Sequence, residues 1–383
     1  MKPKKFLSVL LCIILVCSAA VIPTQAAQID ESTAGAAVGI EKSGEDLTYG
    51  DYKYSVNDDG TVTIKKYSGS ASELTIPNTI DGKSVTSIGY EANGYAMGDY
   101  AFSNCTSLTR VTVPDTVTSI CAFAFCQCTS LTSITIPDCV TSIGERVFYG
   151  CTKLTSIEVS SNNANYKSVD GILYDKDVTT LISCPGGKTS VTIPDSVTSI
   201  GSYAFSSCTS LISVTIPDGV TSIGDSAFYF CTNLTSITIP DGVTSIGTYT
   251  FMSCTSLTYI VIPVSVTSIG NYAFQDCASL KDVYFGGTED EWNSITIQSG
   301  NDALASADKH FINPDDFEYY EQSDGSLTIL KYNGNYKYVY IPSEKDGKIV
   351  KSIGEGFAND NIEGINIPDT VKYIGFLHVF AKI

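Results

Sequence analysis

The chain has 383 residues, with 41 Asp and Glu against 23 Lys and Arg, and its formal net charge at pH 7 is −18. An acidic surface of this kind repels phosphate backbones and anionic lipid head groups, so we expect no nucleic acid partner and no attraction to an anionic membrane. A well solvated, soluble surface is the simpler interpretation of the charge.

Residues 1–26 are typical of a secretory signal peptide. Three lysines precede an apolar run from Phe6 to about Ile22, and the small residue Ala26 is the expected cleavage point, with Ala20 as the alternative. Removal of this segment leaves 20 basic and 41 acidic side chains, a net charge of −21. No later segment is long and apolar enough to span a bilayer. We therefore expect a secreted or cell-surface location and no membrane insertion of the mature chain.

A flexible lead and a cap are expected next. Residues 27–47 are small and polar, which is typical of a chain that does not bury a core. Residues 48–89 are interpreted as an N-terminal cap and first coil, because the stretch after Tyr54 is typical of a hairpin with Asp59-Gly60 at its turn.

The cap pattern returns near the C-terminus. Tyr319 to Gly354 aligns with Tyr54 to Gly89 without a gap, and the Asp-Gly turn, the Ile-Pro pair and the Ser-Ile-Gly end recur in the same order. A solenoid needs atypical units at its ends to cover its open core. We therefore expect a second, truncated array over residues 316–383, which stops within a coil after about one and a half repeats.

Between residues 90 and 285 the sequence repeats with a period of 23. The prolines that mark this step are Pro114 and Pro137, then Pro194, Pro217, Pro240 and Pro263. The cysteines that keep the step are Cys105, Cys128 and Cys151, then Cys208, Cys231, Cys254 and Cys277. A fixed period of about 20 to 29 residues is the mark of a solenoid, whose coils are stable only when neighbours stack on both sides.

One unit, Leu234 to Phe251, predicts the path of a coil. Its apolar positions are Leu234, Ile237, Ile239, Val243, Ile246 and Phe251. The first three match L-x-x-L-x-L, the strand that lines the concave side of leucine-rich repeats. Pro240 ends this strand, because proline cannot donate the next ladder hydrogen bond. Val243 to Ile246 predicts a second short strand, and a brief helical or 3₁₀ segment is expected to hold Phe251.

The full pattern I-P-D-x-V-T-S-I-G-x-x-A-F-x-x-C-x-x-L resembles the 23-residue repeats of the BspA-like bacterial surface proteins, over about residues 50–375. The resemblance implies a β-rich, right-handed leucine-rich repeat solenoid, a horseshoe with a parallel concave sheet and short strands, 3₁₀ or helical turns on the convex side. It also implies a secreted or surface-displayed protein that binds host or matrix proteins, with no catalytic residues in the repeat.

The array has two interruptions and a closing segment. An insert before Ala101 is expected to loop out of one coil. The step between Pro137 and Pro194 is 57 residues, which predicts a hairpin-bearing variant insert over residues 160–185. Residues 286–315 lose the repeat and predict a closing cap. Within it, Thr288 and Glu291 fit a capping box at the start of a short helix.

The cysteines predict a buried ladder. Eleven lie outside the leader, and seven of these occupy the same repeat position next to Phe, where a small apolar thiol stacks on its neighbours. The exceptions are Cys121, Cys126, Cys128 and Cys139, which cluster in the sequence. A disulfide among these four is an open alternative, and a zinc site is less favoured because the spacing is not a paired C-x-x-C.

Aspartates also recur at one position, directly after the turn proline. They are Asp115, Asp138, Asp195, Asp218 and Asp241. Stacked coils would place successive members about 5 Å apart on one edge, but a calcium site needs six or more oxygens that converge on one point. Turn formation is the simpler role for these aspartates, and we expect no metal and no cofactor.

Catalysis has little support in the sequence. His310 and His378 are the two histidines, and the sequence contains no nucleophile elbow, phosphate loop or H-E-x-x-H motif. We therefore expect an adhesin-like, non-catalytic module that binds an extracellular protein or glycan through its concave face. Two alternatives stay open, a carbohydrate-active hydrolase with paired carboxylates in the insert or near Trp292, and a structural spacer without a specific ligand.

The outward strand positions supply the candidate binding residues. Most are threonines, for example Thr112, Thr135 and Thr238, which form good sheet surface. The positions that break this monotony are Arg110, Glu158, Tyr259, Lys281, Asp282 and Tyr284, with Trp292 close behind. Aromatic side chains beside mixed charges are enriched at protein interfaces, which predicts a binding patch in the last two coils. The alternative is that Tyr284 and Trp292 only seal the end of the array.

Overall fold

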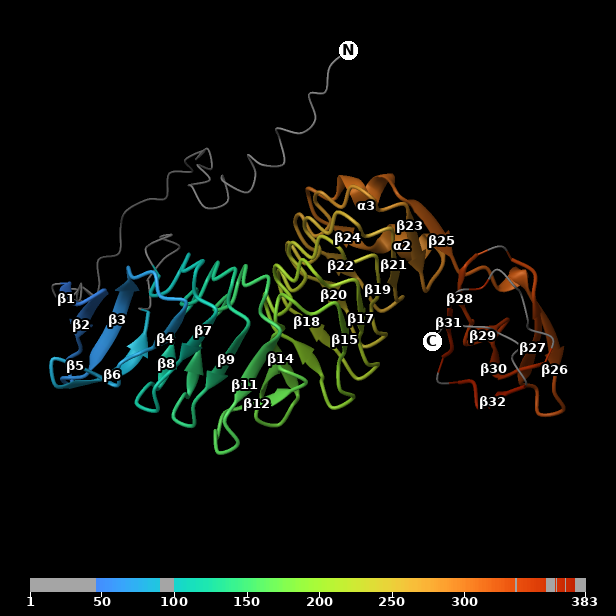
Figure 1. The fold of residues 1–383 in the computed structure, drawn as a ribbon. Coiled ribbons are helices and arrows are strands. Elements are labelled where there is room, and N and C mark those ends of the chain that lie inside the picture. Colours follow the sequence, from blue (N-terminus) through green and yellow to red (C-terminus); the bar gives the residue numbers. More distant parts are fainter. Residues whose placement is uncertain are drawn as a thin grey trace, which may run out of the picture.

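A computed structural model describes residues 46–89, 100–334, 336–355, 362, 364–368 and 370–375. The predicted signal peptide, most of the predicted flexible lead, the insert before Ala101 and the last residues of the second array lie outside the described residues. Figure 1 shows a long stack of coils that changes direction near β14 (Thr180–Ser183), followed by a smaller second stack. No helix in the described part of the chain is long and apolar enough to cross a membrane.

The predicted solenoid is confirmed, and its coils stack through two lines of parallel strands. The first line is β4 (Glu73–Thr75), β7 (Arg110–Thr112), β9 (Ser133–Ile136), β11 (Ser156–Val159), β15 (Ser190–Thr192), β17 (Ser213–Thr215), β19 (Ser236–Thr238), β21 (Tyr259–Ile262), β23 (Asp282–Phe285) and β25 (Asp308–Phe311). The second line is β6 (Lys83–Ile88), β8 (Ser119–Ile120), β10 (Ser142–Ile143), β14, β16 (Ser199–Ile200), β18 (Ser222–Ile223), β20 (Ser245–Ile246), β22 (Ser268–Ile269) and β24 (Thr296–Ile297). Strand partners in regular units are 23 residues apart, for example Ser133 with Ser156.

The interior is filled by one phenylalanine from each regular unit. Phe205, Phe228, Phe251 and Phe274 are fully buried, and their ring centroids follow one another at 4.8, 5.3 and 5.3 Å. Offset ring stacking of this kind adds to the free energy gained by burial. The period of 23 therefore places identical side chains one above the other along the axis of the solenoid.

The segment that holds each phenylalanine is an irregular turn, which corrects the expected helical or 3₁₀ segment. Tyr249 and Ser253, two residues before and after Phe251, have φ angles of 57° and 61°. Left-handed residues at both places prevent a continuous right-handed helix. The turns bond to one another instead. The amide of Phe228 donates to the carbonyl of Thr250 at 2.9 Å, and the amide of Phe251 donates to Ala273 at 2.8 Å. We call this series the turn ladder.

The N-terminal cap is the predicted hairpin. It contains β1 (Leu47–Tyr49), β2 (Tyr52–Val56), β3 (Val62–Tyr67) and β5 (Thr79–Ile80), and β2 pairs antiparallel with β3 around a turn in which Gly60 has a φ of 80°. β3 then pairs in parallel with β6, so the hairpin covers the open end of the stack.

The second array repeats this arrangement. It contains β26 (Phe317–Glu321), β27 (Leu327–Tyr332), β28 (Tyr338–Tyr340), β29 (Glu344–Lys345), β30 (Lys348–Ile353), β31 (Gly364–Asn366) and β32 (Tyr373–Ile374). β26 and β27 form the antiparallel hairpin, and β27 pairs in parallel with β30. The duplication predicted from the sequence is therefore a duplication of structure.

The variant insert contains the predicted hairpin. β12 (Tyr166–Val169) and β13 (Ile172–Asp175) pair antiparallel around Asp170-Gly171, and both turn residues have positive φ. β13 then pairs with β14, which rejoins the second strand line beside β16. Asn163 fixes the start of the insert. Its buried side chain donates to the carbonyls of Pro137 and Val140 at 2.7 and 3.0 Å.

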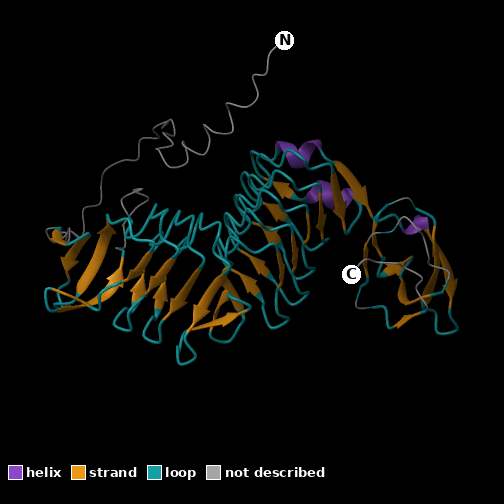
Figure 2. Cartoon of the chain, viewed as in Figure 1, coloured by secondary structure: helices purple, strands orange, loops and turns teal. Residues whose placement is uncertain are grey.

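The closing segment completes one more coil. α2 (Glu289–Ser294) begins with the predicted capping box of Thr288 and Glu291, and α3 (Asp302–Ser306) and the 3₁₀ helix η1 (Pro314–Asp316) follow. Figure 2 shows these short helices in a chain otherwise made of strands and turns. β24 pairs with β22 and β25 pairs with β23, so both strand lines continue into the cap.

Candidate functional site

The outward side of the first strand line is an exposed, hydroxyl-rich surface. We call it the threonine face. Its repeating exposed residues are Thr75, Thr112, Thr135, Thr192, Thr215 and Thr238. The register stacks them, because Thr75 pairs with Thr112 and Thr112 pairs with Thr135. Strands about 4.8 Å apart give this face a regular, nearly flat surface.

Two of the predicted site residues, Arg110 and Glu158, lie exposed on this face. Arg110 is on β7 and Glu158 is on β11, with β9 between them. Glu158 replaces the threonine of its unit, because it pairs with Thr135, and it accepts a hydrogen bond from the Ser156 hydroxyl. The open part of the face therefore carries Arg110, Glu158 and, paired with Arg110 on β4, the exposed Glu73 on a hydroxyl background.

Three other predicted residues, Tyr259, Asp282 and Tyr284, lie at the far end of the same strand line, where the second array packs on the two tyrosines. The ring centroid of Tyr338 lies 4.5 Å from that of Tyr259 and 5.2 Å from that of Tyr284. The two hydroxyls of Tyr259 and Tyr338 are hydrogen bonded. Tyr284 is only 6 % exposed. These contacts join the outward side of β21 and β23 to the outward side of β28.

The same interface contains polar groups. His310 Nε2 lies 2.7 Å from Asp282 Oδ1, and the His310 ring stacks on Tyr284 at 4.7 Å. Tyr340 packs against Gly286, where an added Cβ would lie 2.9 Å from the Tyr340 ring. Burial raises the pKa of the Tyr340 phenol. The expected exposure of the Tyr284 patch is therefore corrected, because the second array packs on it.

The last two predicted residues lie apart from each other. Lys281 is exposed beside β23. Trp292 is 8 % exposed and packs on Phe285 and Phe311, with ring centroids 5.3 and 6.5 Å away. The structure corrects the expectation that Trp292 lies in an exposed patch, because α2 places the indole over the end of the core. The alternative interpretation of Trp292, as a seal, matches this position.

The seven repeat cysteines form the predicted buried ladder. The thiols of Cys231, Cys254 and Cys277 donate to the carbonyl oxygens of Phe205, Phe228 and Phe251 at 3.1, 3.2 and 3.1 Å. Burial raises the pKa of Cys254 well above its ordinary value, and raises that of Cys277 to about 12. A thiol that stays protonated is a poor nucleophile and a poor metal ligand.

The four clustered cysteines are not cross-linked in the described structure. Cys121 and Cys128 are buried, Cys126 is half-buried and Cys139 is exposed. The Cys121 thiol lies 3.7 Å from the hydroxyl of Ser87. Among the described residues, no group of three or more His, Cys, Asp or Glu side chains is placed to hold a metal ion.

The carboxylates that a hydrolase would need are engaged in local structure. In the insert, burial alone would raise the pKa of Asp175, but hydrogen bonds from Thr179 and Thr180 outweigh it and hold the pKa below its ordinary value. Near Trp292, Glu291 accepts from the Thr288 amide in the capping box. A general acid for glycoside hydrolysis needs a raised pKa, whereas the surroundings of Asp175 lower its pKa.

Fold and surface together define a leucine-rich repeat solenoid with 23-residue coils. A family model described as BspA type leucine rich repeat region matches in six copies, over residues 71–170 and 183–299. The chain belongs to this family. The two matched stretches stop and resume within the insert, where the repeat is interrupted.

Solved bacterial repeat proteins also resemble the chain. A leucine rich cell surface protein from Faecalibacterium prausnitzii is 27% identical, with 68% of this chain and 99% of that chain covered and a TM-score of 0.36. A leucine-rich repeat protein from Eubacterium ventriosum is 26% identical, with 72% and 97% covered and a TM-score of 0.40. The pneumococcal vaccine antigen PcpA is 17% identical, with 88% and 95% covered and a TM-score of 0.39. No curated protein gives a significant match.

Proposed function

We propose that this chain is a secreted or cell-surface interaction module that binds an extracellular protein or glycan on the open part of the threonine face, without catalysis. The observation that carries the proposal is the exposed pair of opposite charges, Arg110 and Glu158, on a regular hydroxyl surface. Opposite charges at fixed positions on a flat face orient a partner and select against partners with the wrong charge pattern.

Three further points support the proposal. The chain belongs to a repeat family that is generally non-catalytic. Its first 26 residues have the features of a secretory leader. The F. prausnitzii structure that resembles it is described as a cell surface protein. We infer that the partner surface lies between β4 and β19, because the second array packs on the strands beyond.

The test is a binding screen of the purified chain against immobilised matrix proteins, mucins and bacterial surface glycans. A face variant combines Arg110→Glu with Glu158→Lys, which exchanges the charges and keeps the net charge constant. A control variant combines Lys153→Glu with Asp177→Lys at exposed positions outside the face. We expect a partner that the wild type and the control retain and that the face variant binds about tenfold more weakly, equivalent to about 1.4 kcal/mol.

Three outcomes would overturn the proposal. Equal binding by all three proteins would remove the threonine face as the site. If the wild type retains no partner, the array acts as a spacer. Turnover of a bound glycan by the wild type would instead establish the hydrolase alternative.

A further inference from the structure

The variant insert leaves one turn out of the turn ladder. In a regular unit, twelve residues connect the two strand lines, as between the end of β16 at Ile200 and the start of β17 at Ser213. In the insert, only the six residues from Cys184 to Thr189 connect β14 to β15. This short connection crosses the stack without building the outer turn, so the turns of the flanking units face each other across a gap.

One side of the gap presents amide donors. In the unit before, the amides of Phe123, Phe125 and Gln127 donate to the carbonyls of the next turn at 3.1, 3.0 and 2.7 Å. The equivalent amides one unit later belong to Arg146, Phe148 and Gly150, and they have no acceptor among the described residues.

The other side presents acceptors. In a regular turn, carbonyls at the positions of Ser202, Ala204 and Ser206 accept from the preceding unit. Here only Ala204 does so, from the amide of Cys184 at 2.7 Å. The Ser206 hydroxyl is also buried and has no partner within the described residues. A segment of backbone in the gap would accept hydrogen bonds from the donors on one side and donate hydrogen bonds to the acceptors on the other.

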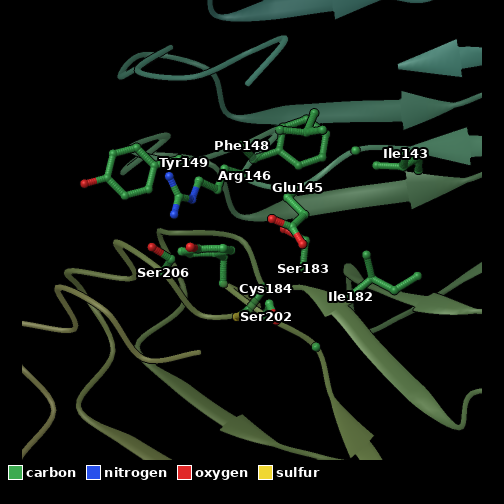
Figure 3. Close-up of a pocket in the computed structure, with 14 residues that line it drawn as sticks. Ile143, Glu145, Arg146, Phe148, Tyr149, Ile182, Ser183, Cys184, Ser202 and Ser206 are labelled. Carbon is green, nitrogen blue, oxygen red and sulfur yellow. The ribbon is translucent and has the colours of Figure 1, made fainter. Parts of the chain in front are cut away.

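The gap is a real hollow of about 200 Å³. Figure 3 shows Glu145, Arg146 and Tyr149 on one side and Ser202 and Ser206 on the other. The Arg146 guanidinium spans it and lies 3.6 Å from the ring centroid of Tyr203. A volume of this size holds on the order of a dozen waters, which is comparable to the backbone atoms of about three residues.

We propose that this hollow binds an extended peptide segment of about three residues from a partner protein, which completes the turn ladder. The carbonyls of its first and third residues accept from Arg146 and Phe148, and its central amide donates to the free carbonyl of Ser202, because Cys184 already bonds the next acceptor, Ala204. This is strand addition applied to a solenoid, in which backbone hydrogen bonds supply affinity. Small side chains fit best, since the hollow has a volume of only about 200 Å³.

A peptide matches the gap better than a sugar does. A sugar hydroxyl both donates and accepts, and it has no preference for a surface with donors on one edge and acceptors on the other. An extended backbone presents its carbonyls and amides in alternation, as each regular turn does. The inference rests on the proposed function in one respect only, that the partner is an extracellular protein.

The probe is the capped tripeptide acetyl-Ser-Ala-Ser-amide, and the readout is amide hydrogen exchange at Arg146, Phe148 and Gly150 measured by NMR. In the free protein these amides should exchange faster than Phe123 and Phe125. Peptide at about ten times its Kd should slow exchange of the Arg146 and Phe148 amides roughly tenfold, since bound protein is protected, and should leave Gly150, which it does not reach, unprotected. The same peptide methylated on its central amide nitrogen should give no protection.

Matched variants localise the effect. Ser206→Tyr fills the hollow with a residue that neighbouring units already have at this position, namely Tyr149 and Tyr229, so the fold should tolerate it. Ser103→Tyr adds the same ring at the equivalent position of another unit. We expect peptide protection in the wild type and in Ser103→Tyr, and none in Ser206→Tyr.

Three results would overturn the inference. They are full protection of the three amides in the free protein, protection by chitotriose but not by the peptide, and no protection by the peptide in any variant. None of these results depends on the threonine face, so failure here is separate from failure in the binding screen with the Arg110 and Glu158 variant.

Discussion

The stacked phenylalanines give the array its most specific packing, and Phe251 tests this contribution. Its ring is fully buried between Phe228 and Phe274, each 5.3 Å away. Phe251→Ala should lower the free energy of unfolding by about 3 to 5 kcal/mol, because it removes the transfer energy of the ring and leaves a cavity. Urea unfolding followed by circular dichroism measures the change.

The control for this prediction is Tyr272→Ala. Tyr272 also stacks on a neighbour, Tyr249 at 5.4 Å, but it is 37 % exposed. Its truncation should cost less than about 1.5 kcal/mol. Equal losses in the two variants would show that the buried stack does not dominate local stability.

The buried thiols predict a loss of stability in alkali, and Cys277 isolates it. Its pKa is about 12 in the folded protein against an ordinary value of 9.0. Above pH 9 the unfolded chain therefore loses this proton while the folded chain keeps it, so stability falls as pH rises from 9 towards 12. The slope for one thiol is about 1.4 kcal/mol per pH unit.

Cys277→Ala should remove this slope. Urea midpoints of the wild type and the variant, measured in reducing buffer from pH 8 to pH 11, should converge as the pH rises. A constant difference between the two proteins across this range would mean that the Cys277 thiol ionises in the folded state.

For single residues, the sequence predicts which side chains are buried better than it predicts which groups they contact. The period identifies which Phe and Cys are buried, because burial in a solenoid follows from repeat position alone. It does not predict that five of these thiols donate to the carbonyl of a Phe one unit earlier, since that contact depends on how the coils stack. The sequence also gives no signal for the positive φ angles of Tyr249 and Ser253, because tyrosine and serine have no preference for that conformation.

Among the elements, the closing cap depends on Asn301, which ends the turn ladder. Its side-chain carbonyl accepts from the Phe274 amide at 2.9 Å, in the place where earlier units use a backbone carbonyl. Its amide donates to the carbonyls of Gly270 and Gln298 at 3.0 and 2.8 Å. Asn301→Ala leaves buried groups unpaired and should destabilise the cap by about 2 to 4 kcal/mol.

Amide exchange distinguishes a local effect from a global one. In Asn301→Ala the Phe274 amide should exchange much faster, while the Phe251 amide, which bonds to the carbonyl of Ala273 in the following unit, should change little. Ser299→Ala is the control, since its hydroxyl bonds only to the exposed Asn271 side chain. Equal acceleration at Phe251 and Phe274 would mean that the cap and the array open together.

The elements themselves were largely predictable, because each has a local signal. The Asp-Gly turn of the first cap and the capping box of α2 depend on residues next to each other in the sequence. The tight turn at Asp170-Gly171 has the same Asp-Gly signal. The missing turn also has a signal, since Cys-Pro-Gly-Gly at residues 184–187 replaces the usual Ala-Phe-x-x-Cys.

For the whole molecule, the main departure from the sequence prediction is the contact between the two arrays. Tyr259 and Tyr284 were expected to point outward, and they do. Their partner, Tyr338, lies 79 residues beyond Tyr259, in a unit whose own sequence resembles an ordinary cap. Docking of one array on another depends on the shape of both surfaces, and no repeat pattern encodes it.

Tyr338 tests this docking. Tyr338→Ala removes ring contacts to Tyr259 and Tyr284 and should weaken the interface by on the order of 2 kcal/mol. The second array should then move away from the first, which increases the radius of gyration in small-angle scattering and exposes β21 and β23 to amide exchange. Tyr320→Ala, at an exposed site away from the interface, is the control. Identical scattering from both variants would show that other contacts hold the arrays together.

The interruption that creates the hollow also divides the core, and the chain should unfold in steps because of it. Buried side chains before the insert form one cluster and those after it form another. Leu173 packs in the first, whereas its neighbours Ile172 and Tyr174 pack in the second. In a linear stack, cooperativity passes only through the contacts between neighbouring coils. At this junction the turn ladder is open, so those contacts are fewer than between regular units.

Native-state amide exchange at increasing urea should therefore give two opening free energies within the first array. Exchange of amides in the turns before the insert, such as Phe125, should accelerate over one range of urea concentration. Exchange of amides after the insert, such as Phe228 and Phe251, should accelerate together over a different range. The second array has its own buried cluster and should open separately. Phe251→Ala provides the decisive comparison. It should lower the opening energy of Phe228 and leave that of Phe125 unchanged, whereas an equal decrease at both amides would mean that the insert transmits cooperativity across the junction.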